Sequence, residues 1–394
     1  MSRSRADSGR DERSPAIWSM LAAATIAAAT ASLAAGCGES TGPDDVAIEI
    51  VGRVERSAVV TLSATFHGRM LADSEVTWTA EPAGAVSFLA GGSALLVQSG
   101  QVTLSAKTAV VIGSRTFEVA VPPAIVFDLL RDGNRDIYRA ALDGLDRVRL
   151  TTHTGDDSDP TAVGDGVVFV SYRDGNGELY VTSLSGGTPS RLTFTNVAEA
   201  GPALSWDGGW LAYTRSDGGV PKLYVGQSDG SGALRVTGNF GFAGSIEASP
   251  SWAPLGDRLA FVSTSEGTAD LFTYTSSTGD FAALVPDSAS SAEVEPAWSP
   301  DGAWVAFVSD RTGDTELHVL EVATGALSQL TNRPGSDGHP TWVPDGRLVY
   351  VAWTDGTPRL RWLDPQVPDV IHEIDVGPGE PRHPAGVVLL QASQ

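Results

Sequence analysis

A repeat of about 41 to 48 residues fills the sequence from residue 126 to the C-terminus. Its clearest copy, residues 296–331, reads PAWSPDGAWVAFVSDRTGDTELHVLEVATGALSQLT. Short apolar runs alternate there with turns such as Pro300-Asp301-Gly302, which predicts four short antiparallel strands. Six copies can be counted from the starts of their second strands, at Val126, Val167, Leu211, Leu259, Val305 and Val349. A period of this length with four strands per copy is typical of a β-propeller.

The two ends of the repeat region are incomplete in complementary ways. The first copy enters at its second strand, at residues 125–130, and residues 384–390 form a first strand with no partners after it. We therefore predict an all-β, six-bladed propeller in which the C-terminal strand completes the blade formed by residues 125–151. Closure of this kind removes exposed sheet edges, which promote aggregation. A sandwich or a solenoid is the competing geometry.

Several of these residues resemble the repeats of the TolB-type propeller family. The resemblance rests on Trp298-Ser-Pro-Asp-Gly302, on the strand end at residues 307–313 and on Asp132-Gly-Asn-Arg-Asp-Ile-Tyr138. It implies the propeller fold over the whole repeat region. It implies less about function, because members act in envelope integrity with peptidoglycan-associated partners while similar repeats occur in regulatory propellers of peptidases and in some lyases.

Residues 1–36 have the pattern of a secretory signal peptide. Four arginines in the first fifteen residues precede an uncharged, Ala-rich stretch. It ends in Leu33-Ala-Ala-Gly-Cys37, which resembles the bacterial lipoprotein signal, in which cleavage before the cysteine allows lipid attachment. We predict an exported protein that is lipid-anchored through Cys37 in the cell envelope, at the outer membrane on its periplasmic or surface side. An uncleaved membrane anchor is the alternative.

The remaining chain divides into three parts. Residues 37–45 are polar and turn-rich and read as a tether. Residues 46–122 contain seven short strand-like runs, and the segment around Trp78 resembles bacterial Ig-like domains, which predicts a small β-sandwich. Residues 123–394 form the predicted propeller.

Composition and motifs exclude several functions. The formal net charge is −22, and an acidic chain of this kind repels phosphate backbones, which argues against a nucleic-acid partner. The single cysteine excludes an internal disulfide and a Cys-based metal site. No nucleophile elbow, His-Glu-x-x-His motif or phosphate-binding Gly loop occurs in the sequence. We therefore predict a protein without a catalytic residue or a resident cofactor.

The best candidate site appears when the repeats are aligned. The residues directly before the proline of each first strand are Asp159, Gly201, Ser249, Glu295, His339 and His383. Because the first strand of a blade is innermost, these positions are expected to ring the mouth of the central channel. Asp159, Glu295, His339 and His383 would then lie on four consecutive blades and form a ligand-binding site, with His339 and His383 as candidate metal ligands. Asp156, Asp157, Asp337 and Arg382 lie nearby in the same loops and are expected to make the mouth mostly acidic.

Two classes of function follow from this sequence. The first is a non-enzymatic envelope lipoprotein whose propeller serves as a binding scaffold for a protein, a peptide or a glycan. The second is a metal-dependent, lyase-like enzyme that acts at the channel mouth through His339 and His383. A regulatory propeller that pairs with a separate hydrolase is a further alternative.

Overall fold

The computed structural model describes residues 46–238, 244–285 and 291–389, and it divides the chain into two compact units, Met1–Ala120 and Val121–Gln394. The predicted signal peptide, Cys37 and the tether lie outside the described residues. The described chain is all-β apart from the single-turn helix η1 (Asp73–Glu75). Among these residues we find no helix with the length and apolar character needed to cross a bilayer.

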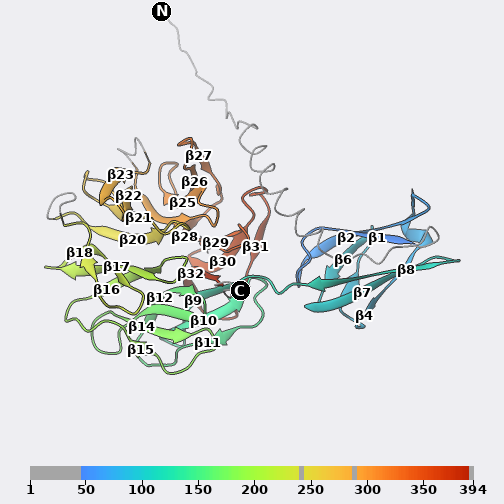
Figure 1. Cartoon of the computed structure of the whole chain (residues 1–394), viewed down its shortest axis with the longest axis horizontal. Helices are drawn as coiled ribbons and strands as arrows, with labels where there is room; N and C mark the ends of the chain where they lie inside the picture. The colour runs from blue at the N-terminus through green and yellow to red at the C-terminus, as the bar shows by residue number, and fades with distance from the viewer. Residues whose placement is uncertain (1–45, 239–243, 286–290, 390–394) are drawn as a thin grey trace, which may run out of the picture. The chain divides into compact units, whose positions relative to one another are not determined.

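The N-terminal unit is built from two antiparallel sheets (Figure 1). One sheet contains β1 (Ala47–Val51), β2 (Val59–Phe66), β6 (Ser93–Leu96) and β5 (Val86–Phe88), with β3 (Arg69–Met70) paired to β2. The other contains β4 (Thr77–Glu81), β7 (Gly100–Lys107) and β8 (Ile112–Val119). Alternate side chains from both sheets share one apolar core, as the pattern of period two requires. The predicted two-sheet sandwich is therefore present, and the Ig-like relationship stays a prediction.

The C-terminal unit consists of short antiparallel sheets that follow one another along the chain (Figure 1). Four sheets have four strands each: β16–β19 (Glu199–Leu204, Trp210–Asp217, Val220–Gln227, Leu234–Arg235), β20–β23 (Glu247–Trp252, Arg258–Ser263, Asp270–Thr275, Asp280–Ala283), β24–β27 (Glu293–Trp298, Trp304–Ser309, Glu316–Glu321, Leu327–Gln329) and β28–β31 (Ser336–Trp342, Leu348–Thr354, Thr357–Leu363, Ile371–Glu373). This succession of four-stranded sheets is a β-propeller, as the repeat predicted.

The first and last strands of the propeller share one eight-stranded sheet. Its order is β11-β10-β9-β32-β12-β13-β14-β15, with β9 (Ala124–Arg131), β10 (Asn134–Ala141), β11 (Val148–Arg149), β12 (Asp157–Val163), β13 (Gly166–Ser171), β14 (Glu178–Ser183), β15 (Ser190–Arg191) and β32 (Glu380–Val388). The C-terminal strand β32 pairs antiparallel with β9, as predicted, and lies beside it in Figure 1. It also pairs in parallel with β12 through Ala162 and Val163. The first strands of successive sheets contact one another in a closed cycle from β12 through β16, β20, β24, β28 and β32.

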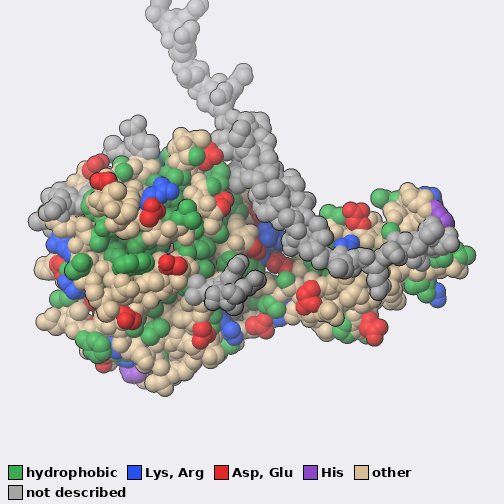
Figure 2. All heavy atoms as spheres, viewed as in Figure 1, with side chains coloured by type: hydrophobic (Ala, Val, Ile, Leu, Met, Phe, Trp, Pro, Cys, Tyr) green, Lys and Arg blue, Asp and Glu red, His purple; other side chains and the backbone are tan. Residues whose placement is uncertain are grey.

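Apolar side chains between neighbouring sheets form the propeller's interior. In the cluster between the sheets of β9 and β29, Phe127 and Leu129 contact residues such as Val349 and Val351, all of them fully buried. Each second strand contributes side chains to both of its faces, which explains its nearly continuous apolar sequence. Acidic side chains are spread over the surface that is visible in Figure 2, in keeping with the formal net charge of −22.

Candidate functional site

The same backbone irregularity occurs once in each innermost strand. The register of the strand pair shifts between Ser158 and Thr161 in β12, and equivalent shifts occur in β16, β20, β24, β28 and β32. Each shift contains the repeated proline, which has no N–H to donate to the ladder and is therefore found at bulges. The residues before these prolines are Asp159, Gly201, Ser249, Glu295, His339 and His383, and all have a positive φ of 44° to 55°.

These six residues line one cavity of about 340 Å³, together with their six prolines. The structure therefore brings all of the predicted mouth residues together. Five of the six are not glycine, so each holds a left-handed backbone at a cost of roughly 1–2 kcal/mol. Strained backbone of this kind is concentrated at functional sites, which makes the mouth the leading candidate site.

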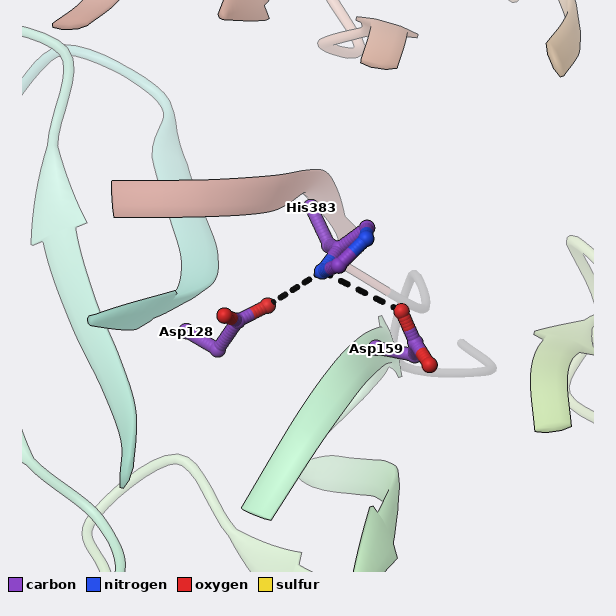
Figure 3. A group of neighbouring side chains, drawn as sticks. All are labelled: Asp128, Asp159 and His383. Carbon is purple, nitrogen blue, oxygen red and sulfur yellow. Dashed lines mark hydrogen bonds and ion pairs between the residues drawn. The ribbon is translucent and has the colours of Figure 1, made fainter. Parts of the chain in front are cut away.

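His383 connects three strands at the mouth (Figure 3). Its Nδ1 lies 2.6 Å from Oδ1 of Asp128 on β9 and 3.1 Å from Oδ1 of Asp159 on β12. Asp128 is fully buried, and its second oxygen accepts a hydrogen bond from Arg135. The side chain of His383 keeps 32% of its surface exposed. One side of the imidazole is thus fixed by carboxylates while the ring remains accessible from the cavity.

A second imidazole–carboxylate pair lies beside the first. Nδ1 of His339 is 3.0 Å from Oε1 of Glu295, and Oε2 of Glu295 accepts a hydrogen bond of 2.6 Å from the backbone N–H of His339. The rings of His339 and His383 meet edge to face with centroids 4.3 Å apart. The ring centroid of Trp353 lies 5.6 Å from that of His339. The two pairs therefore form one contiguous cluster.

Burial and charge act in opposite directions on this cluster. Burial would raise the pKa of Asp128 and Glu295, but hydrogen bonds from His383 and His339 lower each pKa below its usual value. Burial raises the pKa of Asp159. Burial would lower the pKa of His383, but its hydrogen bond to Asp128 and the nearby carboxylates raise it above the usual value. The cluster contains three carboxyl groups, Asp128, Asp159 and Glu295, beside the Arg135 guanidinium and two imidazoles, so it is rich in atoms that accept hydrogen bonds or bind cations.

A cation is therefore the ligand that this cluster suits chemically. Oxygen and imidazole nitrogen atoms of Asp128, Asp159 and His383 all lie within 4.8 Å of one another, a spacing that can hold a metal ion. Of the predicted metal candidates, His383 belongs to this group, and His339 instead pairs with Glu295.

Asp128 was not among the predicted site residues. It interrupts an apolar strand, and the equivalent positions in other blades include Val170, Val262 and Val308, so the repeat alignment contains a signal for it. The charged residues expected near the mouth do not line the cavity: Asp156, Asp157, Asp337 and Arg382. Asp157 forms an ion pair of 3.2 Å with Arg173, which neutralises it within its own blade.

Comparison with solved structures places this chain among propellers. TolB from Acinetobacter baumannii shares 17% sequence identity at a TM-score of 0.61, with 78% of this chain and 82% of that chain covered. A putative TolB from Agrobacterium tumefaciens shares 18% identity at a TM-score of 0.53, with 64% and 88% covered. A chain of a nidogen/laminin complex shares 14% identity at a TM-score of 0.54, with 68% and 99% covered. At these identities the likeness concerns the fold alone.

Comparison with sequences identifies a family, whereas the solved structures show the fold alone. No curated protein sequence matches this chain. The model of the PD40 family, described as the TolB beta propeller domain, matches residues 86–220 and 249–364, which is more than half of the chain. The repeats, the succession of four-stranded sheets and this match agree, and the chain belongs to the TolB beta propeller domain family.

Proposed function

We propose that this protein is a non-enzymatic binding scaffold whose propeller mouth recognises a cationic group on a peptide or protein partner. The observation that carries the proposal is that Asp159, Glu295, His339 and His383 line one cavity and hold a strained backbone, with the buried Asp128 behind His383. A concentration of carboxyl groups in a partly buried, concave site favours a Lys or Arg side chain, or a peptide amino terminus. The fold of the nidogen/laminin complex and of TolB supports a protein-binding role in general terms.

The proposal includes a closed, six-bladed ring. The eight-stranded sheet separates at the parallel pair of β12 and β32 into two groups of four strands, which together with the four other sheets make six blades. The junction joins the blade of β9–β11 and β32 to the blade of β12–β15 through two residue pairs, and β32 pairs with β9 along most of its length.

The location in this proposal is the cell envelope, with a lipid on Cys37. The support is the sequence pattern of residues 1–37 alone. Incorporation of radiolabelled palmitate by the full chain in a bacterial host is expected, and Cys37→Ser is expected to abolish it. Incorporation that survives this substitution would contradict the anchor without affecting the scaffold role.

Selection from a displayed library of random heptapeptides tests the scaffold role. Peptides rich in Lys or Arg should be enriched on the native protein and lost on the double variant Asp159→Asn, Glu295→Gln. Asp355→Asn is the matched control, because Asp355 also has a positive φ of 54° but lies outside the cavity. Enrichment of peptides without basic residues would contradict the proposal. Equal enrichment of basic peptides on the native and double-variant proteins would also contradict it.

A metal-dependent enzyme is the second candidate. It rests on the spacing of Asp128, Asp159 and His383, whose ligand atoms lie within 4.8 Å. Elemental analysis of purified protein separates the two candidates. One bound divalent ion per chain that is lost in the double variant His339→Ala, His383→Ala favours the enzyme, and metal-free protein that still selects basic peptides removes it.

A further inference from the structure

A second cavity lies beside the sheet of β16–β19, on the face opposite to Thr214. This Phe194 cleft has a volume of about 660 Å³, and its lining includes Arg191, Phe194, Val197, Arg215 and Asp217. Phe194 is 77% exposed although it is a large apolar residue. Phe194 therefore offers an accessible aromatic ring within a concave surface.

The mouth and the Phe194 cleft share strand β17. Thr214 lines the mouth, and the next residue, Arg215, lines the Phe194 cleft. Consecutive side chains of a strand point to opposite faces, so the two cavities flank one sheet. The segment that carries Phe194 and Val197 leads directly into Glu199, which opens β16 two residues before Gly201 of the mouth. Both cavities therefore lie at the same end of β16.

The charges of the Phe194 cleft are already paired. Arg191 forms ion pairs of 2.9 Å with Asp174 and with Glu178. Arg215 lies 3.3 Å from Asp217 and also donates to the hydroxyl of Tyr224. With their edges engaged, guanidinium groups offer their flat faces for stacking. The guanidinium carbon of Arg191 lies 4.9 Å from the centre of the Phe194 ring, and that of Arg215 lies 3.8 Å from the centre of the Tyr224 ring.

These surfaces select an aromatic side chain over a charged one. We infer that the Phe194 cleft is a second subsite, which binds an aromatic residue of the same extended peptide whose basic residue occupies the mouth at Asp159. This inference rests on the proposed peptide-binding function. Asp159 on β12 and Arg191 of the Phe194 cleft on β15 belong to the same sheet, with β13 and β14 between them. Because neighbouring strands lie about 5 Å apart, the path from Asp159 to the cleft is on the order of 10–15 Å. An extended peptide covers that distance in roughly three to five residues.

The test uses fluorescence anisotropy with labelled probes of the form Ac-Lys-(Gly)n-Phe-NH2, where n runs from zero to six. The expected result is an optimum at two to four intervening glycines. At this optimum, affinity should exceed that of the same probe ending in Gly by about tenfold or more, the value of burying one Phe side chain. Phe194→Ser should abolish that gain and leave the Gly-ended probe unaffected. Leu255→Ser is the matched control, because Leu255 is also exposed, at 93%, and lies outside the cleft.

The outcomes separate this inference from the proposed function. Equal binding of Phe-ended and Gly-ended probes, with no effect of Phe194→Ser, overturns the second subsite and leaves the mouth as a cation site. Binding of neither probe overturns both. A Phe-dependent gain that survives Phe194→Ser places the aromatic residue elsewhere and overturns the assignment to this cleft.

Discussion

His383 and Asp128 are 255 residues apart in the chain, yet Nδ1 of the first lies 2.6 Å from Oδ1 of the second. This contact joins the C-terminal strand to the first strand of the propeller at the site where we place ligand binding. Recognition and ring closure therefore depend on the same pair of side chains.

Replacing His383 with Ala is expected to destabilise the propeller. The Asp128 carboxylate is fully buried and would keep only its partner Arg135. Loss of one hydrogen bond to a buried charged group costs about 1–3 kcal/mol. Urea unfolding followed by tryptophan fluorescence measures the change. The control is His153→Ala, which removes an exposed imidazole of the same unit; equal losses in both variants would contradict the role assigned to His383.

Truncation after Gly379 removes all of β32 and should prevent the propeller from folding. The deletion leaves β9 without its inner partner, and an unpaired apolar strand edge is a site of aggregation. Size-exclusion chromatography and thermal unfolding are the measurements. Truncation after Leu389 keeps every pair that β32 makes and is the control. A soluble, cooperatively unfolding protein ending at Gly379 would show that the C-terminal strand is dispensable.

Glu199 makes the stability depend on pH. Its side chain is buried, and its Oε2 has no hydrogen-bond partner among the described residues. Burial, together with the nearby Glu178 carboxylate, raises the pKa of Glu199 to about 7. The folded state therefore holds a proton more tightly than the unfolded state does. The stabilisation is complete below the unfolded pKa of about 4.5 and is lost as pH rises to 7, a change on the order of 3 kcal/mol.

The variant Glu199→Gln should remove this dependence. Its free energy of unfolding is expected to exceed that of the native protein at pH 8 and to differ little at pH 5. Denaturant unfolding at both pH values gives the comparison, and the control Glu266→Gln changes an exposed glutamate. An unchanged pH profile in Glu199→Gln would show that the carboxyl is not the group responsible.

Substitutions at Gly201 test whether the mouth requires a left-handed backbone at this position. Its φ is 55°, and a Cβ added there would lie 3.8 Å from Cδ of Pro250, so space is available. Gly201→Asn should change stability little because Asn tolerates the left-handed region. Gly201→Val should cost about 1–2 kcal/mol more, since a branched side chain does not adopt this conformation readily. Thermal unfolding of the two variants is the measurement, and equal stability would contradict a backbone origin.

The repeat made much of this structure predictable. Proline recurs at one position of each copy, and its missing N–H fixes a bulge there, so the six mouth residues could be aligned before the fold was known. The closing strand could be recognised because both ends of the repeat were incomplete. The predicted pairing of β32 with β9 is confirmed.

Other features depend on contacts that no single repeat contains. Asp128 on β9 contacts His383 on β32 and Arg135 on β10, so its role becomes visible only when the ends of the propeller meet. The Phe194 cleft combines the loop at residues 194–197 with strand residues of two successive sheets, Arg191 on β15 and Arg215 on β17, and the repeat pattern contains no signal for it. The misplacement of Asp157 has a similar cause, because its burial depends on the ion pair with Arg173.

The register of β32 with β9 also determines when the protein can finish folding. During translation, residues 124–131 leave the ribosome long before residues 380–388 are made, and contacts so distant in sequence are slow to form. Every nascent chain must therefore wait with an unfinished blade until residues 380–388 have been made. A chaperone has the whole of that interval in which to bind the unpaired strand.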